Sequence, residues 1–303
     1  MKQYSRRFGL FRDPAVGREI AACDAVRDCQ RIVHLLTVYE FAFDVQHALE
    51  LALLYTFGSR SVARVLAKTG AFERRGQKRY DDTQLIINRF VEAGYDSPLG
   101  QRAISRMNEI HRRYDIANDD LLFVLWTFID FPEAWLRAHG WRAMTAHEAM
   151  AWFTFWRNVG LRMAIADLPE TKAAFDAFVA RYEAREMRPS PEARRVADAT
   201  LGVLRGQLPR PLGALATPVA MSLAPARLCE VFGYAPPPSG LARAVDAALR
   251  AYAAVSRRVP LTRYPALVDD ADTVTYGRRT PPVEALGVDR RGPSSLASSR
   301  ARG

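Results

Sequence analysis

Cysteine is scarce in this sequence, which contains only Cys23, Cys29 and Cys229. Their spacing matches no metal-binding pattern, and three thiols cannot all pair with one another in disulfides. Disulfides persist in oxidising compartments, so reduced and mostly buried cysteines are the simplest interpretation. We therefore predict a cytoplasmic location.

Long apolar runs are missing as well. The longest, LELALLYTF at residues 49–57, is much shorter than the ~20 residues that a membrane-spanning helix requires. Residues 1–20 contain the pair Arg6-Arg7, but no apolar run follows it, so a secretory signal is not expected. The sequence predicts no transmembrane segment.

Several common motifs are also absent. No stretch alternates apolar and polar residues as a half-buried strand does. Gly-rich phosphate loops, paired-histidine zinc motifs and the Gly-x-Ser-x-Gly elbow are not found, which excludes many nucleotide-binding proteins, zinc hydrolases and serine hydrolases. Apolar residues instead recur at helical spacing over most of the chain. The predicted fold class is all-α, a single compact multi-helix domain of about ten helices.

The basic charge is strong but dispersed. Of the net charge of +10, residues 276–303 contribute +4, with six arginines against two acidic residues. Other basic residues are scattered along predicted outer helix faces, without the runs or interleaved aromatic residues of a stacking platform. We expect no specific nucleic-acid partner. Attachment of the arginine-rich tail to an acidic surface remains a separate hypothesis.

A candidate site is centred on the helix that Ser97 and Pro98 should begin, by capping it and occupying its first turn. One stripe of this helix carries Ile104, Met107, His111 and Tyr114. The other side carries Arg102, Arg106, Glu109 and Arg113. His111 should therefore point inward. It is either a neutral core imidazole bonded to a carbonyl or carboxylate, or a ligand of a metal or haem iron.

The segment before this helix offers further candidates. Residues 72–78 are predicted to form a basic loop, and Arg79 to Thr83 a turn. Asp81 or Asp82 should cap the helix that follows. An arginine that opens a turn is usually solvated or capping, but its guanidinium can also hold a carboxylate through two hydrogen bonds.

Two groups of side chains allow both a structural and a functional interpretation. Polar residues interrupt the apolar face of the helix predicted from Ile32 to Phe57, and they serve either as acid or base or as partners of their neighbours. They are Glu40, Asp44, His47 and Glu50. The long helix predicted from Thr145 to Ala164 is rich in large rings, which either fill the core or line a pocket. They are Trp152, Phe153, Phe155 and Trp156.

Much of the chain resembles a family of haem-dependent oxygenases. This family contains the rubber oxygenases (latex-clearing proteins) and the oxygenase that shortens the farnesyl side chain in mycophenolic acid biosynthesis. The main matching segments are TGAFERRGQKRYDDT at 69–83, RMNEIHRRYDIANDDLLFVLWTF at 106–128 and FPEAWLRAHGWRAMTAHEAMAWFTFWRNVG at 131–160. IADLPE at 165–170 and RYEAREM at 181–187 extend the match. The sequence is most similar to the mycophenolic-pathway branch, over roughly residues 40 to 235.

The resemblance implies roles for particular residues. It implies a b-type haem with His111 as the proximal ligand of the iron, and it gives Arg79 and Thr83 the positions of an Arg-x-x-x-Thr pair needed for activity or haem retention. Arg113 is a second candidate partner for a haem propionate. Rubber oxygenases carry a lysine just before the threonine, whereas this chain has Asp82. That difference argues against a lysine-capped iron and against polymer cleavage. The catalytic glutamate of the family has no matching position.

The expected function is accordingly that of a haem b-dependent oxygenase. The substrate would be small, apolar and isoprenoid-like or otherwise unsaturated, dioxygen would be the second substrate, and an electron donor is a further partner. The alternative is a helical protein of the same fold that binds an apolar metabolite without redox chemistry. Residues 1–30 would form an arm and first helix, residues 31–268 the catalytic domain, and residues 269–303 a disordered basic tail. The oligomeric state is left open.

Overall fold

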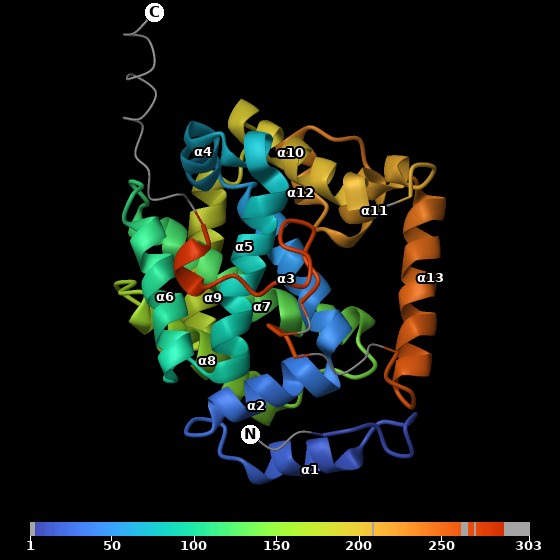
Figure 1. Ribbon diagram of the computed structural model, residues 1–303. Coiled ribbons are helices and arrows are strands. Elements are labelled where there is room, and N and C mark those ends of the chain that lie inside the picture. The colour runs from blue at the N-terminus through green and yellow to red at the C-terminus, as the bar shows by residue number, and fades with distance from the viewer. Residues whose placement is uncertain (1–3, 208, 262–265, 270, 288–303) are drawn as a thin grey trace, which may run out of the picture.

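Helices make up the chain throughout the computed structural model, which describes residues 4–207, 209–261, 266–269 and 271–287 (Figure 1). Within these ranges the structure has isolated β-bridges but no strand. The all-α prediction is confirmed. The α-helices are α1 (Pro14–Ala22), α2 (Cys29–Leu35), α3 (Ala42–Thr56), α4 (Arg60–Thr69), α5 (Ala71–Ala93), α6 (Pro98–His111), α7 (Asn118–His139), α8 (Ala146–Arg162), α9 (Lys172–Glu186), α10 (Pro191–Gln207), α11 (Ala216–Leu223), α12 (Arg227–Phe232) and α13 (Ser239–Ser256).

The central helices α3, α5 and α7 are surrounded by the others (Figure 1). α3 packs along α7, α5 packs along α6, and α10 crosses α4 and α5. α2 packs against α8 and is joined to α3 through a π-helical turn at Leu36–Glu40. This turn breaks the helix that was predicted to run without interruption from Ile32 to Phe57. α13 stands at one edge of the molecule, where it contacts α11 and α7.

The predicted start of α6 is confirmed. The Ser97 hydroxyl accepts a hydrogen bond from the Gly100 backbone nitrogen at 3.0 Å, and Pro98 occupies the first turn. Gly94 ends α5 in a conformation with φ of 84°, which a residue with a side chain rarely adopts. The chain can therefore turn back sharply, and α6 lies against α5.

The first turn of α6 approaches the Gly94 turn too closely for a side chain. A Cβ atom added at Gly100 would lie 2.9 Å from the Gly94 carbonyl carbon and closer still to its oxygen. Since both partners are backbone, we expect Gly100→Ala to lower the free energy of unfolding by about 3 kcal/mol. The matched control is Gly202→Ala in α10, where nothing lies within 4 Å and the better helix propensity of alanine should stabilise the protein by up to about 1 kcal/mol. Urea unfolding of both variants checks the prediction, and equal effects would contradict it.

Helix α5 starts earlier than the sequence predicted. Residues 72–78 are helical rather than a loop, with a kink at Arg75, whose φ is −145°. Arg79 and Thr83 lie one turn apart inside this helix and not in a turn before it. Asp81 and Asp82 are 2% exposed and cap nothing. The expected cap was wrong because both carboxylates have partners from a distant part of the chain.

These partners belong to residues 271–287, which we call the C-terminal strap. Asp82 accepts hydrogen bonds from the Tyr276 hydroxyl at 2.6 Å and the Gly287 backbone nitrogen at 2.9 Å. The Thr275 backbone nitrogen donates to Asp81 at 2.8 Å. The strap runs across α5 and α6 as the red segment of Figure 1. The prediction of a disordered tail from residue 269 was therefore wrong for residues 271–287, and the rest of that tail, residues 288–303, lies outside the described residues.

The strap also changes the assignment of the outer face of α6. Arg106 was placed on the side of the helix opposite His111, yet it is 4% exposed and its Nε donates to the Leu286 carbonyl at 2.9 Å. Leu286 itself is fully buried. On α5, Arg89 is 2% exposed and donates to the Leu85 and Pro281 carbonyls. Two buried guanidinium groups thus hold the strap through its backbone, so the segment needs no apolar periodicity to be ordered.

His34 in α2 makes stability sensitive to acid. Burial, with the charge of Arg31 acting in the same direction, lowers the pKa of His34 from 6.5 to about 4. The unfolded chain therefore takes up a proton at His34 between pH 6.5 and 4, while the folded chain does not. The contribution of the neutral imidazole to the free energy of unfolding is complete above pH 6.5 and is lost as pH falls to 4. Between pH 7 and 4, His34→Gln should lose roughly 3 kcal/mol less stability than the wild type. Urea unfolding at both pH values tests this, and parallel losses would contradict it.

Candidate active site

Helices α3, α4, α5, α6, α7 and α8 all contribute to the wall of an apolar cavity of about 1210 Å³, including the part open to solvent. Its wall is formed mainly by aliphatic and aromatic side chains, with a few polar groups among them. The polar residues of the wall are Thr56, Thr69, Arg79, Thr83, His111, Tyr114 and Asp120. The cavity therefore brings together three of the residues that the sequence singled out, Arg79, Thr83 and His111.

His111 is the last residue of α6, and its ring faces the cavity. Met107 and Tyr114 line the cavity beside it, and Ile104 is 3% exposed, so the predicted inward stripe of this helix is confirmed. Burial lowers the pKa of His111 to about 4, and the positive charge of Arg79 acts in the same direction. The imidazole is therefore neutral at neutral pH. Across the described ranges of the chain, no residue forms a hydrogen bond with this ring.

Arg79 places a positive charge in the same cavity. Its guanidinium carbon lies 5.7 Å from the centre of the Phe72 ring, and its Nε is buried without a hydrogen-bond partner. Among the described residues, no carboxylate pairs with this guanidinium. A partly buried cation without a counter-ion is unfavourable, so this group is suited to an anionic ligand.

Thr83 lies one turn after Arg79 on the same face of α5. Its Oγ1 donates to the Arg79 carbonyl at 2.8 Å. Because the hydroxyl proton is used in this bond, the oxygen is left to accept hydrogen bonds in the cavity. Thr83 also lines a second cavity next to the first. Leu53, Ile87 and Phe128 likewise line both cavities.

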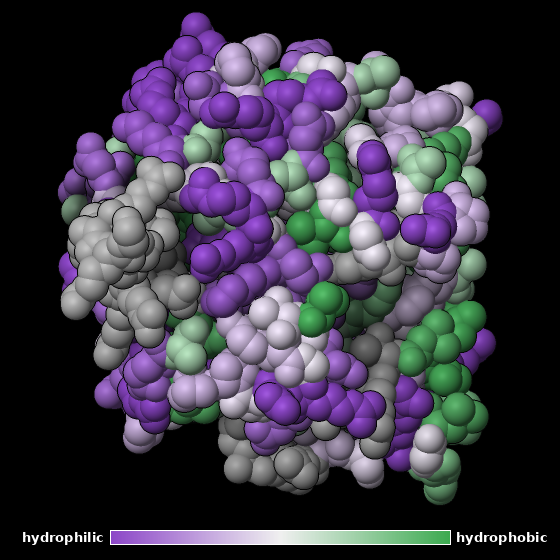
Figure 2. Space-filling view, turned by 45° about the horizontal axis from the view of Figure 1, so that its top comes forward, coloured by the Kyte–Doolittle hydropathy of each residue, from purple (hydrophilic) through white to green (hydrophobic). Residues whose placement is uncertain are grey.

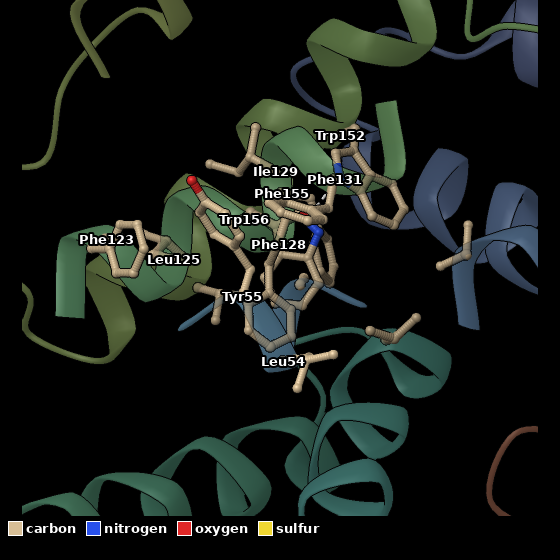
Figure 3. Close-up of a cluster of buried hydrophobic side chains, with 14 of the residues drawn as sticks. Leu54, Tyr55, Phe123, Leu125, Phe128, Ile129, Phe131, Trp152, Phe155 and Trp156 are labelled. Carbon is tan, nitrogen blue, oxygen red and sulfur yellow. Dashed lines mark hydrogen bonds between the residues drawn. The ribbon is translucent and has the colours of Figure 1, made fainter. Parts of the chain in front are cut away.

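Arg113 is not brought to this cavity. Its side chain is 32% exposed, and its Nη2 pairs with Glu109 at 2.9 Å. Of the aromatic residues of α8, only Trp156 lines the cavity, where it packs against Phe128 with ring centres 5.0 Å apart (Figure 3). The Trp152 indole donates to the Phe128 carbonyl in the core.

The sequence alone did not single out the unsatisfied indole of Trp156. Its Nε1 is buried without a hydrogen-bond partner. The signal was only the concentration of large rings in one helix, which could not separate the wall of a cavity from the core behind it. The sequence also did not identify Asp120 as a wall residue. Its two carboxylate oxygens accept hydrogen bonds from the Ser61 and Tyr182 hydroxyls.

The acid and base candidates of the π-helical turn and of α3 do not line the cavity of His111. Burial raises the pKa of Asp44 to about 6, and this carboxylate accepts a hydrogen bond from the Trp135 indole at 3.0 Å. Glu40 pairs with Arg142, and His47 contacts the Phe43 carbonyl through Nδ1. Glu50 lines the second cavity, where it accepts a hydrogen bond from the Tyr80 hydroxyl at 2.5 Å. Each of the four thus has a structural partner.

Residues 48–258 match the sequence model of one family, described as ER-bound oxygenase mpaB/B'/Rubber oxygenase, catalytic domain. The chain belongs to this oxygenase family. The match includes the helices that carry Arg79, Thr83 and His111. It ends before the C-terminal strap, so the strap is a feature that the family match does not cover.

Three fungal oxygenases are similar to this chain. ER-bound oxygenase mpaB' of Penicillium brevicompactum is 31% identical over 222 residues, which are 66% of this chain and 52% of that protein. ER-bound oxygenase mpaB of Penicillium roqueforti (strain FM164) is 32% identical over 56% of this chain and 63% of its own. ER-bound oxygenase mpaB of Penicillium brevicompactum is 32% identical over 54% and 47%. The chain thus spans about half to two thirds of the length of these relatives.

Two features of this family member bear on its site. Asp82, which stands where the rubber oxygenases carry a lysine, points toward the strap and does not line the cavity of His111. The described helices also include none long and apolar enough to cross a bilayer.

Proposed function

We propose that this protein is a haem b-dependent oxygenase that acts on a small apolar, unsaturated substrate. The observation that carries the proposal is one apolar cavity in which a neutral, unpartnered imidazole and an unpartnered guanidinium face the same space. Membership of an oxygenase family supports oxygen chemistry at this site.

The residues of the cavity fit a haem. A neutral imidazole nitrogen is the form that ligates iron, and burial keeps His111 in that form. Haem carries two propionates, and Arg79 has the charge and the free Nε to hold one of them. The aliphatic and aromatic wall provides the flat apolar surface that a porphyrin requires. Arg113 already pairs with Glu109 on the outer side of α6, which leaves Arg79 as the better candidate.

When bound, the haem would supply the site for dioxygen activation, and the protein would supply position and surroundings. The apolar wall would exclude water and hold a hydrocarbon substrate. Thr83 would accept a hydrogen bond through Oγ1, because its own proton is donated to the Arg79 carbonyl. Arg79 would stabilise negative charge inside the cavity. If it pairs with a propionate it retains the haem, and if it lies beside the oxygen it acts in the reaction.

The shape of the space favours an apolar substrate over a charged one. The second cavity lies beside the first, and Leu53, Thr83, Ile87 and Phe128 line both. Its polar residues are uncharged except for Glu50, and this carboxylate is already bonded to Tyr80. Cleavage of a double bond is the reaction that we infer for such a substrate.

The proposal is tested by the absorption spectrum of the protein expressed with a haem precursor. We expect a Soret band, a pyridine haemochromogen spectrum of b type, and a shifted band when carbon monoxide is added after reduction. Oxygen uptake with a short isoprenoid alcohol then tests the reaction. Colourless protein that also fails to take up added hemin would refute the haem assignment. A haem spectrum without oxygen uptake for any alkene would support the alternative of a binding protein.

The two candidate propionate partners can be separated by matched variants. Arg79→Met should weaken haem retention by about 10- to 100-fold, because a charge-assisted hydrogen bond contributes about 1.5–3 kcal/mol. Arg113→Met should leave retention unchanged, since this side chain does not line the cavity. Haem transfer to an excess of apomyoglobin measures both rates. Equal rates for the two variants would argue against the role of Arg79.

A further inference from the structure

A tight turn at the N-terminus exposes large apolar side chains to solvent. The Arg7 and Phe11 backbones pair across residues 7–11, which we call the aromatic turn. Phe8 is 82% exposed, and Leu10 and Phe11 are 49% and 45% exposed. Phe8 has a φ of 52° and Gly9 a φ of 72°. A left-handed backbone at a large side chain is unfavourable and is usually retained where another requirement outweighs it.

The base of the aromatic turn is firmly held. Arg12 donates to the carbonyls of Ser256, Tyr39 and Glu40, and its guanidinium lies 4.2 Å from the centre of the Trp141 ring. The Arg12 backbone nitrogen also donates to the Arg258 carbonyl at 2.9 Å. The turn is therefore fixed to the end of α13, while its apolar tip stays free of the core.

The end of α13 continues the same surface. Val255 is 49% exposed and Leu261 is 51% exposed. Along the exposed side of α13 the outward residues are mostly small and apolar, and Figure 2 shows apolar side chains gathered along this edge of the molecule. The exposed apolar groups of the turn and of the helix end thus adjoin one another through Arg12, Ser256 and Arg258.

The charge of this surface has one sign. Residues 4–12 and 255–261 include no acidic residue, but they contain Arg6, Arg7, Arg12, Arg257 and Arg258. Arg7, Arg257 and Arg258 are exposed. Apolar side chains surrounded by arginines are the combination that binds an anionic lipid surface, because the rings enter the interface while the guanidinium groups contact phosphate. A protein partner that buried this surface would have to be acidic as well as apolar.

We propose that the aromatic turn and the C-terminal end of α13 form a docking surface for an anionic lipid bilayer. Phe8, Leu10 and Phe11 enter the interface between headgroups and acyl chains, and the arginines pair with lipid phosphates. The contact is peripheral and depends on salt, since a few exposed charges contribute most of the initial attraction.

Docking would also bring the bilayer close to the cavities. A small pocket lined by Arg12, Tyr252 and Leu261 underlies the docking surface. It shares Ala42 with the cavity that reaches Thr83. The docking surface is therefore close to that cavity, with Ala42 as the wall residue common to both. The docking itself does not depend on the proposed function, and it can be measured without haem or substrate.

Vesicle sedimentation tests the proposal with the full chain. We expect the protein to bind vesicles of phosphatidylcholine with phosphatidylglycerol, to bind pure phosphatidylcholine weakly, and to lose binding as salt increases. The triple variant Phe8→Ala, Leu10→Ala, Phe11→Ala should bind at least about tenfold more weakly. The variant Arg7→Gln, Arg257→Gln should lose about fivefold for each arginine. The control Met150→Ala, Leu161→Ala removes similarly exposed apolar groups elsewhere and should bind like the wild type.

Insertion can be separated from simple charge attraction. In Phe8→Trp, the added indole should be quenched by brominated acyl chains, whereas contact with headgroups alone would leave it unquenched. The substituted residues lie outside the cavities described above and outside the buried core, so unchanged thermal unfolding confirms that the variants are folded. Wild-type protein that ignores anionic vesicles, or a triple variant that binds them normally, would overturn the proposal. Concentration-dependent dimerisation that the triple variant abolishes would instead assign the surface to a second copy of the chain.

Discussion

Replacing His111 with alanine is expected to remove the Soret band of the haem-loaded protein. The imidazole is the only neutral nitrogen ligand that we assign to this cavity, and burial already keeps it unprotonated. Loss of a group that merely orients a metal ligand costs 10–100-fold in affinity, so loss of the ligand itself should cost more than about 100-fold. Titration of the apoprotein with hemin measures the change.

Two controls accompany the His111 variant. His147→Ala removes a histidine that does not line the cavity and should leave hemin binding unchanged. Imidazole added to His111→Ala should restore part of the band by occupying the vacated space. If His111→Ala binds hemin like the wild type, the ligand is another residue, and the proposed arrangement of the cavity fails with it.

Replacing Asp82 with alanine is expected to release the C-terminal strap and to lower the free energy of unfolding by about 2–3 kcal/mol. The carboxylate is 2% exposed and accepts hydrogen bonds from Tyr276, Gly287 and Lys78, the last at 2.6 Å. Removing one member of a buried charged group leaves its partners unsatisfied. The Lys78 side chain is 26% exposed, so water can solvate its ammonium group when the carboxylate is removed. The expected loss of unfolding free energy is therefore smaller than for a fully buried pair.

Urea unfolding measures the stability of Asp82→Ala, and limited trypsin digestion measures release of the strap. Cleavage after Arg278 or Arg279 should become much faster than in the wild type. The matched control is Asp272→Ala in the same segment, where an exposed ion pair with Arg278 at 3.4 Å should contribute less than about 0.5 kcal/mol. Similar losses for the two aspartates would show that the buried carboxylate does not hold the strap.

Local chemistry was sufficient to predict the helix that carries His111. Ser97 and Pro98 define its start, and the spacing of apolar residues gives its inward face, so neither depends on distant contacts. The same is true of α8, which was predicted to begin at Thr145 and where Thr145 and Glu148 form a capping box. In these elements the signal and its cause lie within one helical turn.

The failures arose where distant contacts decide the structure. The charged residues around Gly76 suggested a loop, but a Cβ at Gly76 would lie 2.9 Å from the Val203 side chain of α10, so this glycine serves close helix packing. Asp81 and Asp82 were taken for caps, although their partners lie nearly 200 residues later in the chain. A single sequence contains no sign of such pairs.

The candidate site shows the same difference between features set by local sequence and features set by distant contacts. Helical spacing correctly turned His111 inward. Arg79 and Thr83 were singled out by the family resemblance, and their place on one helix face was not predicted. Helical spacing could not show that Arg79 lacks a counter-ion, because that depends on which helices meet. The pair of Arg113 with Glu109, four residues earlier, is local. The chemical roles of Arg79 and Arg113 remain predictions that the hemin experiments test.

The position of the strap bears on how fragments of this protein would behave. The part that matches its family ends at residue 258, yet Arg89 and Arg106 in the middle of the chain direct their side chains to carbonyls of residues 281 and 286. A truncation made at the homology boundary would uncover four charged side chains that are now sealed from water, two acidic and two basic. We therefore expect the smallest fragment that folds on its own to extend through the C-terminal strap, beyond the part that the family match covers.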